Sequence, residues 1–254
     1  MTTLASVAAL VLGAGRGERL GHALPKAFVP VAGRALIERS IQALAASGEF
    51  SRIQPVLASS EFARFDELGL VGSMRGVVEG VVEPVAGGAE RQDSMRAGLA
   101  ALPATVEFVA VHDAARCLVS ALDLRAVVAA ARRDGAAILG ERSRDTIKRV
   151  VHGRIVETPL REECWSAQTP QVIRRDWLEE AALAAALAGR VGTDDAQLVE
   201  WMGHEVTMVE ASAPNPKVTR PEDLILAETL LAQQAILAQQ AILAEEAGRG
   251  DASI

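Results

Sequence analysis

The stretch from Val7 to Lys26 constrains the fold more than any other part of the chain. It opens with six apolar residues, Val7–Leu12, and this lack of polar alternation is typical of a strand buried on both faces of a parallel sheet. Glycines follow at positions 13, 15, 17 and 21, with basic side chains among and after them. A glycine-rich turn after a buried strand lets backbone N–H groups approach a phosphate, and basic side chains add full charge. The pattern therefore predicts a nucleotide site.

Two common phosphate-binding motifs are excluded at this turn. The dinucleotide fingerprint needs a third glycine where Glu18 or Leu20 stands, depending on the glycine at which it begins. The ATPase P-loop needs Gly-Lys-Ser/Thr, whereas Lys26 follows Pro25 and precedes Ala27. What remains, G-x-G-x-G-x-R-L followed by Pro-Lys, is similar to the signature of nucleotidyltransferases that make nucleotide-activated sugars and alcohols. The alternative is a turn that binds nothing. Such a turn would need only one glycine, and it would leave the basic residues without a role.

Composition narrows the class of protein further. The 254 residues suit one α/β domain, and a hydrophobic content of 50% allows a large core. No apolar run approaches the ~20 residues that span a bilayer, so we expect no membrane segment. No basic residue precedes Arg16, and Cys117 and Cys164 are too few for a disulfide framework, so we expect a cytoplasmic protein. The net charge of −7 disfavours a nucleic-acid partner.

Apolar runs and helical periodicities alternate along most of the chain. This alternation predicts an α/β fold, a single Rossmann-like, mostly parallel sheet covered by helices, with ligands at the carboxyl ends of the strands. The Gly13 loop, the Gly87 loop and Asp113 would meet at that edge. Pro55 suggests that its strand is irregular or at an edge. The expected strands are 7–12, 53–58, 77–82, 108–111, 136–139 and 205–209, and the expected helices are 36–46, 62–70, 94–102, 122–132, 176–188 and a long helix from Pro221.

Residues 142–165 interrupt this alternation. Residues 146–151 and 154–157 read as two strands, and His152-Gly153 between them is a turn signal, so a β-hairpin is expected. The hairpin has too few apolar residues to form a core of its own. It is either a solvated excursion or an arm that reaches onto a partner chain, and we favour the arm.

The end of the chain reads as an addition to the domain. Ala-Gln-Gln-Ala-Ile-Leu occurs at 232–237 and again at 238–243, and a period of six spreads apolar positions around a helix. We therefore expect a domain at 1–231 and, at 232–254, a helical extension with a disordered tail from Gly248.

Several segments together resemble the 2-C-methyl-D-erythritol 4-phosphate cytidylyltransferase family, in the order in which that family has them. The resemblance extends to about residue 231, and the combination is more specific than any single motif. Two positions depart from the family pattern without removing a functional group, Gly13 where many relatives have alanine and Cys117 where proline is common. The segments are 13–26, 87–94, 112–116, 144–148, 168–171, 193–194 and 215–219.

The resemblance implies a reaction. The family joins CTP and methylerythritol phosphate into a CDP-alcohol and pyrophosphate, in non-mevalonate isoprenoid synthesis. The nucleophile is a phosphate that is already ionised at neutral pH, so no general base is needed. Catalysis must then consist of alignment and of charge that stabilises the transferring phosphoryl group.

The resemblance also implies roles for individual residues. Arg19 and Lys26 would stabilise the transferring group, and Asp113 would hold Mg²⁺ or another divalent cation, with a helix N-cap as the alternative for Asp113. Lys217 and Arg161 would hold the methylerythritol phosphate. The residues that would frame CTP are Ala14, Gly15, Gly17, Gly88, Arg91, Ser94 and Ala114. A further phosphate contact from Arg116 and hydroxyl contacts from Thr146 and Thr193 complete the expected set, and Thr193 has a helix N-cap as its alternative.

Partners and rival functions follow from the same resemblance. Relatives use such an arm to clasp a twofold partner, so we expect a homodimer with shared active sites, and leave open whether Arg161 and Thr146 act within their own chain. The nearest rival is a cytidylyltransferase for ribitol 5-phosphate. The second is a non-catalytic nucleotide-binding protein, which would not need charge directed at a leaving pyrophosphate.

Overall fold

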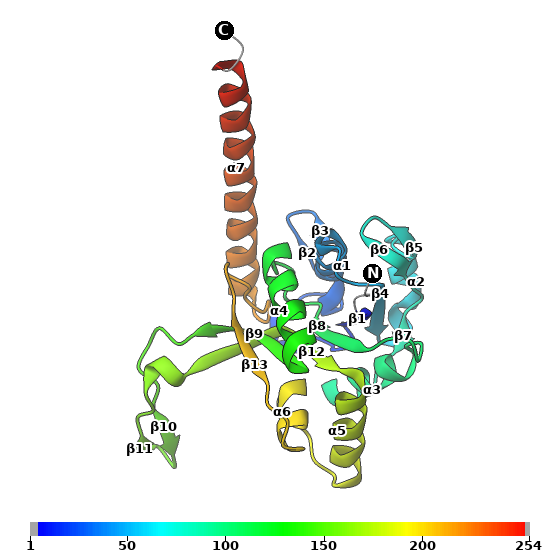
Figure 1. The fold of residues 1–254 in the computed structure, drawn as a ribbon, viewed down its shortest axis with the longest axis vertical. Coiled ribbons are helices and arrows are strands. Elements are labelled where there is room, and N and C mark those ends of the chain that lie inside the picture. The colour runs from blue at the N-terminus through cyan, green and yellow to red at the C-terminus, as the bar shows by residue number, and fades with distance from the viewer. Residues whose placement is uncertain (1–4, 252–254) are drawn as a thin grey trace.

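The computed structural model describes residues 5–251, without the side chains of Ser73, Ala238 and 241–251. A nine-stranded sheet forms the centre of the fold, with helices on both of its faces (Figure 1). Its middle strands, β8 (Phe108–Asp113), β1 (Val7–Leu12) and β4 (Arg52–Leu57), are parallel neighbours. The mostly parallel α/β architecture predicted from the sequence is confirmed.

Two strands run against the others, and neither was predicted from the sequence. β12 (Trp165–Arg174) lies antiparallel between β8 and β9 (Ala136–Arg142), and β5 (Gly72–Met74) lies antiparallel to β6 (Val77–Val81). Polar residues interrupt β12 as far as Gln171, and the strand contains Pro170, so neither alternation nor an apolar run marks it. The sheet order is β13 (Thr207–Glu210), β9, β12, β8, β1, β4, β6 and β5, and β7 (Val85–Ala86) also pairs with β4.

The continuous apolar run of β1 serves two cores. Val7, Ala9 and Val11 belong to the cluster that includes α1 (Leu36–Ser47) and α4 (Ala121–Asp134). Ala8 and Leu10 belong to the opposite cluster, with α3, α5 and α6. Burying one such valine or leucine contributes about 1.5–3 kcal/mol, so both helical layers fix this strand firmly. The bounds of the second layer are α3 Arg91–Ala100, α5 Arg175–Leu187 and α6 Asp195–Glu200.

The position of Pro55 corrects one expectation. β4 is an internal strand and not an edge strand, because it pairs with β1 on one side and with β6 and β7 on the other. On that second side the pairing passes from Ile53–Val81 in β6 to Val56–Val85 in β7. Pro55 lies opposite the gap between β6 and β7. The hydrogen-bond ladder is irregular there, so the missing N–H of the proline is tolerated.

The smaller elements complete the chain. α2 (Phe62–Asp66) is shorter than expected, and a short β2–β3 hairpin (Pro30–Val31 and Arg34–Ala35) precedes α1. Residues 5–251 also contain four 3-10 helices, η1 (Glu18–Leu20), η2 (Lys26–Phe28), η3 (Ser59–Glu61) and η4 (Arg161–Glu163).

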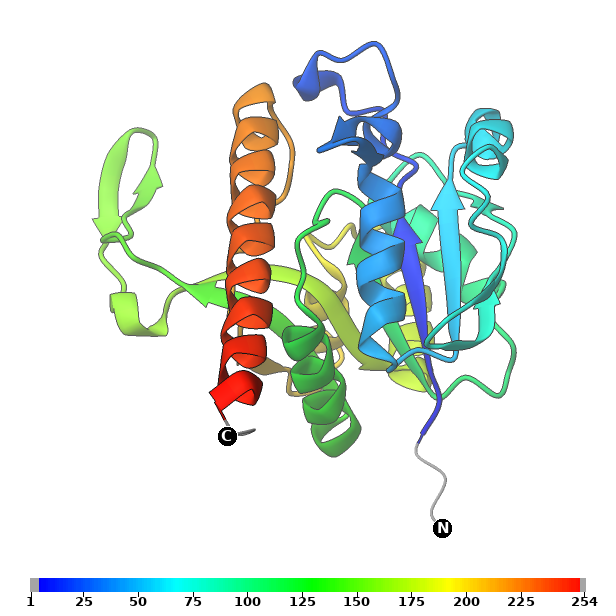
Figure 2. The ribbon, with the colours of Figure 1, turned by 90° about the horizontal axis from the view of Figure 1, so that it is seen from above.

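The hairpin protrudes from the domain, as predicted. Within the described part of the chain, β10 (Arg149–Val151) and β11 (Arg154–Glu157) pair only with each other, and every residue of both strands is exposed. They lie away from the sheet in both views (Figures 1 and 2). The segment 146–148 lies outside β10, so the first strand is shorter than expected.

The C-terminal helix α7 begins at Pro221, as predicted, and extends from the domain to Asp251 (Figure 1). Its first turns pack through Leu224, Ala227 and Leu231 on a small apolar cluster beside the glycine-rich loop. The helix continues past Gly248, where we expected disorder, and residues 252–254 lie outside the described part of the chain. The division at residue 231 falls inside this helix and stays a prediction. Across residues 5–251, no helix combines the length and apolar character that crossing a bilayer requires.

Candidate active site

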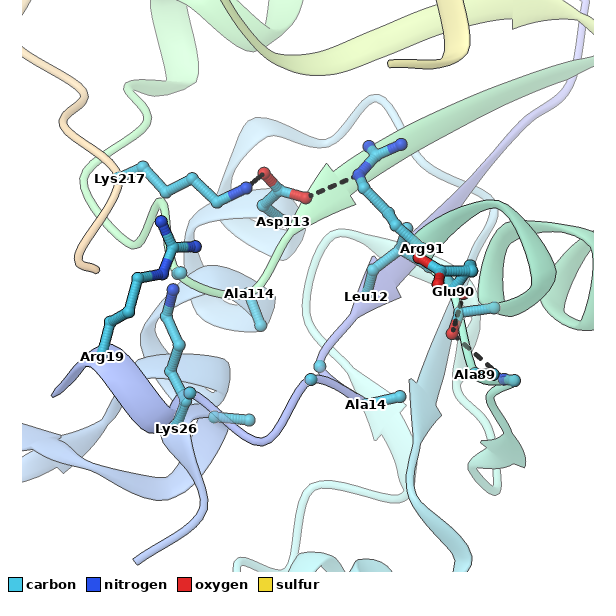
Figure 3. A pocket seen from close by; sticks show the side chains of 17 residues that line it. Leu12, Ala14, Arg19, Lys26, Ala89, Glu90, Arg91, Asp113, Ala114 and Lys217 are labelled. Atoms are coloured by element: carbon cyan, nitrogen blue, oxygen red, sulfur yellow. Dashed lines mark hydrogen bonds and ion pairs between the residues drawn. The ribbon is translucent and has the colours of Figure 1, made fainter. Parts of the chain in front are cut away.

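A cavity of about 310 Å³ opens where β1 and β8 end (Figure 3). Four segments that are distant in sequence surround it: the loop after β1, the start of α3, the end of β8 and the loop before α7. They meet because parallel neighbouring strands place their carboxyl ends at the same edge of the sheet. The lining residues are Leu12, Gly13, Ala14, Gly15, Gly17, Arg19, Lys26, Ala27, Gly88, Ala89, Glu90, Arg91, Ser94, Asp113, Ala114, Ala115 and Lys217.

Gly17 and Gly15 of the loop lack a side chain for different structural reasons. Gly17 has a φ of +70°, and a Cβ there would lie 2.3 Å from the Cβ of Lys26. A side chain at this position would therefore displace Lys26. At Gly15 a Cβ would meet no atom within 4 Å, so its absence leaves room in the cavity. The loop thus presents bare backbone to the cavity at Gly15.

Three cations gather at one side of the cavity, and their side chains converge there in Figure 3. Arg19 belongs to η1 and Lys26 begins η2, whereas Lys217 lies in the loop before α7. Burial, together with the charges of Lys217 and Arg19, lowers the pKa of Lys26 from 10.5 to about 8. Positive groups held this close favour a ligand with several negative charges.

Asp113 is the anion of this group. Its carboxylate accepts a hydrogen bond from Arg91 Nε at 3.2 Å and lies 2.7 Å from Lys217 Nζ. Burial alone would raise its pKa, but Arg91 and Lys217 hold the pKa well below its usual range. Asp113 ends β8 and caps no helix, since the next helix, α4, is capped by Ser120. The N-cap alternative for Asp113 is therefore wrong.

The residues present fit a hard divalent cation only with help from a ligand. In the described part of the chain, no three His, Cys, Asp or Glu side chains lie close enough together to hold a metal ion. Mg²⁺ commonly binds through one or two carboxylates, with phosphates and waters as its other ligands. The ionised Asp113 lines the cavity and suits that arrangement, provided that Lys217 moves off its Oδ2.

The loop before α3 is shaped by side-chain caps. Glu90 and Asp93 form a capping box at the start of the helix. Ser94 Oγ accepts the N–H of Gly88 at 3.2 Å and donates to the carbonyl of Glu90 at 3.2 Å. Ser94 thus fixes the loop in which Gly88 lines the cavity.

Asp195 is an interacting residue that the sequence interpretation missed. Its Oδ2 accepts a hydrogen bond from Arg91 Nη2 at 2.7 Å, and its side chain is buried at the start of α6. A signal was present: Asp195 shares a helical face with Leu198 and Val199, at the spacing of a buried apolar stripe. A charged residue on such a face requires a partner.

Comparison with known proteins agrees with this geometry. The model of the family described as 2-C-methyl-D-erythritol 4-phosphate cytidylyltransferase matches residues 7–233. The chain belongs to this family. A family member from Syntrophotalea carbinolica is 39% identical over 226 residues, which are 88% of this chain and 95% of that protein. Another, from Frankia casuarinae, is 44% identical over 227 residues, 88% of this chain and 80% of its own length.

Solved structures of the family share the fold. The cytidylyltransferase from Thermus thermophilus is 33% identical, with a TM-score of 0.70 over 89% of this chain and 98% of its own. The 4-diphosphocytidyl-2C-methyl-D-erythritol synthase from Anaerococcus prevotii is 25% identical, with a TM-score of 0.79 over 91% of this chain and all of its own.

Two residues implied by the family resemblance, Arg116 and Thr193, do not line the cavity. Arg116 donates to the carbonyl oxygens of Asn215 at 2.8 Å and Ala167 at 3.3 Å, so its guanidinium joins two chain segments. Thr193 is exposed, and the N-cap of α6 is Asp194, which accepts the N–H of Gln197 at 2.9 Å. The N-cap alternative for Thr193 is therefore wrong by one residue.

The two remaining residues lie on the arm. Thr146 and Arg161 are exposed, and Arg161 pairs with its neighbour Glu162 at 3.3 Å. Neither side chain lines the cavity of its own chain. One chain therefore brings together the nucleotide-binding part of the predicted site but not the arm.

Proposed function

We propose that this protein transfers CMP from CTP to 2-C-methyl-D-erythritol 4-phosphate, giving the CDP-alcohol and pyrophosphate for non-mevalonate isoprenoid synthesis. The observation that carries the proposal is the convergence of Arg19, Lys26 and Lys217 at one side of the cavity, where Lys217 pairs with Asp113, in a member of this family. A phosphate oxygen of the alcohol bonds to the α-phosphorus, and the bond from that phosphorus to the β-phosphate oxygen breaks. Pyrophosphate leaves with the electron pair, and no proton needs to move.

The cavity supports a division of roles on the nucleotide side. Ala14, Gly15 and Gly17, with Gly88, Ser94 and Ala114, present backbone and small side chains to CTP, and Arg91 orders the same wall. Arg19 and Lys26 offset the charge that develops on the transferring phosphoryl group. Mg²⁺ held by Asp113 would supply further charge to the triphosphate.

The alcohol side combines residues from separate regions. We assign the methylerythritol phosphate to Lys217, with Arg116 close by and Arg161 from the arm, and its hydroxyl groups to Thr146 and Thr193. Val150, Ile155 and Leu160 of the arm are 52%, 63% and 64% exposed, which suits an apolar contact with a second copy of the chain. We therefore propose a cytoplasmic homodimer in which each arm reaches the partner's site.

The function is tested by incubating the protein with CTP, Mg²⁺ and one alcohol phosphate at a time. Pyrophosphate should appear with methylerythritol phosphate and should disappear when the divalent cation is chelated. Release with ribitol 5-phosphate alone would transfer the assignment to the rival cytidylyltransferase. Binding of CTP without release for any acceptor would favour a nucleotide-binding protein.

The lowered pKa of Lys26 predicts a pH dependence. The lysine is charged below its pKa of about 8, so kcat/KM for CTP should fall as the pH rises through that value. A bound triphosphate favours the charged form of Lys26 and so raises the pKa of the lysine in the complex. The decline of kcat should therefore begin at a higher pH than the decline of kcat/KM. The Lys26→Arg variant, whose side chain stays charged, should lose this alkaline decline whatever its absolute rate. A wild-type kcat/KM that stays level to pH 10 would contradict the role of Lys26.

A further inference from the structure

Asp195 is a buried carboxylate that the proposed mechanism does not yet use. It begins α6, is 1% exposed and does not line the cavity. Its backbone N–H and that of Ala196 both donate to Gln171 Oε1, each at 2.9 Å. Because Gln171 belongs to β12, these bonds tie the start of α6 to the central sheet. The carboxylate of Asp195 is therefore held in a fixed place.

Arg91 joins this carboxylate to the cavity. Its Nη2 donates to Asp195 Oδ2 at 2.7 Å, and its Nε donates to Asp113 Oδ1 at 3.2 Å. A guanidinium can bind one carboxylate with two parallel hydrogen bonds, but here its donors are divided between two carboxylates. Burial alone would lower the pKa of Arg91, yet Asp195 and Asp113 raise it above its usual value. Arg91 is therefore a charged bridge with both ends engaged.

We infer that Asp195 is a positioning residue for the nucleotide site, acting on Asp113 through Arg91. Asp195 holds Nη2, so Arg91 offers Asp113 one hydrogen bond and covers only Oδ1. Oδ2 stays directed at Lys217, and a divalent cation can replace that lysine when it arrives with a triphosphate. This inference rests on the proposed function, because it takes Asp113 to be the carboxylate that holds the cation.

Removing the charge of Asp195 while keeping its shape isolates this role. In Asp195→Asn the side chain fills nearly the same volume, but Arg91 loses one of its two counter-charges. The guanidinium then turns both donors toward Asp113 and competes with the cation. Hydrogen bonds to charged groups are strong enough for this loss to weaken the effect of Mg²⁺ on CTP binding about tenfold or more.

The experiment measures CTP binding by calorimetry with and without Mg²⁺, which requires no turnover. The ratio compared is the dissociation constant of CTP without Mg²⁺ divided by the one with Mg²⁺. This ratio should fall about tenfold in Asp195→Asn relative to wild type. Asp123→Asn is the matched control, because Asp123 is also buried, at 2% exposure, and accepts a backbone hydrogen bond from Ser212 at 2.8 Å. Asp123 lies outside the cavity lining, so this variant should keep the wild-type ratio.

A second variant reports on the same bridge if Asp195→Asn does not fold. The ammonium group of Arg91→Lys cannot span both carboxylates and has no second nitrogen to turn onto Asp113, so this variant should not show the tenfold fall. Adding Asp195→Asn to Arg91→Lys should change the ratio no further, because the bridge is already lost. A further fall in the double variant would show that Asp195 does not act through Arg91 and would overturn the inference.

The remaining outcomes separate this inference from the proposed function. A wild-type ratio in Asp195→Asn would overturn the positioning role alone. Wild-type protein whose CTP affinity is the same with and without Mg²⁺ would overturn both the metal role of Asp113 and the inference. Failure to release pyrophosphate from methylerythritol phosphate would overturn the function, whereas the binding ratio would still decide the role of Asp195.

Discussion

Lys26→Ala should lower kcat by a factor of about 10² to 10³, which is the usual cost of removing one preorganised donor from a developing negative charge. Arg19→Ala should lose a similar amount. Both side chains line the cavity, and Arg19 is exposed, so its removal leaves the core intact. The loss should appear in kcat with less change in KM for CTP, because the charge is needed most in the transition state.

A control from the same loop sharpens this result. Arg16 is exposed and does not line the cavity, so Arg16→Ala removes a positive charge nearby without touching the site. It should retain nearly full kcat. Thermal unfolding of all three variants shows whether they stay folded. The expectation would be wrong if Arg16→Ala lost much of its kcat, or if a folded Lys26→Ala lost little. Either result would mean that the overall positive charge of the loop matters more than the position of each charge.

Mixing two inactive variants should restore about a quarter of wild-type activity if the arm acts on the partner. Lys26→Ala and Arg161→Ala are unfolded and refolded together, so that about half of the dimers are mixed. Each mixed dimer then contains one site with an intact Lys26 and an intact arm from the partner. The reason to expect exchange is that Arg161 and Thr146 are exposed on a protruding hairpin and do not line the cavity of their own chain.

The matched control combines two lesions of the cavity itself. In a mixture of Lys26→Ala and Arg19→Ala, every site carries one lesion from its own chain, so no activity should return. Mixed dimers are verified by tagging one variant. If both mixtures stay inactive while mixed dimers form, Arg161 serves its own chain, and the arm acts as a scaffold alone.

The nucleotide side of the site could be predicted because its signals are local. Val7–Leu12 and the glycines after it specify a buried strand and a bare loop within a single short stretch. Asp113 follows directly from the same reasoning, since it ends a second apolar run. Parallel pairing then brings these segments to one edge without further information.

The rest depends on contacts that a sequence does not display. β12 was missed because its first residues are held by pairing with β9 alone, and not by a pattern of their own, and only Gln171–Arg174 also pair with β8. The link from Asp195 to Arg91 joins residues that are 104 positions apart. Thr193 was misplaced as a helix cap because Asp194 is an equally good capping residue, one position later.

The bridge at Asp113 also determines when the chain can first bind its ligand. The carboxylate contacts Arg91 and Lys217, and Arg91 in turn contacts Asp195. Arg91 lies in the first half of the chain whereas Asp195 and Lys217 come much later, so a nascent chain that stops before Lys217 has only part of the site. Long-range closure of this kind comes late in folding, because the entropy of the intervening chain must be lost first. Nucleotide binding can therefore stabilise only a chain that is long enough to include Lys217.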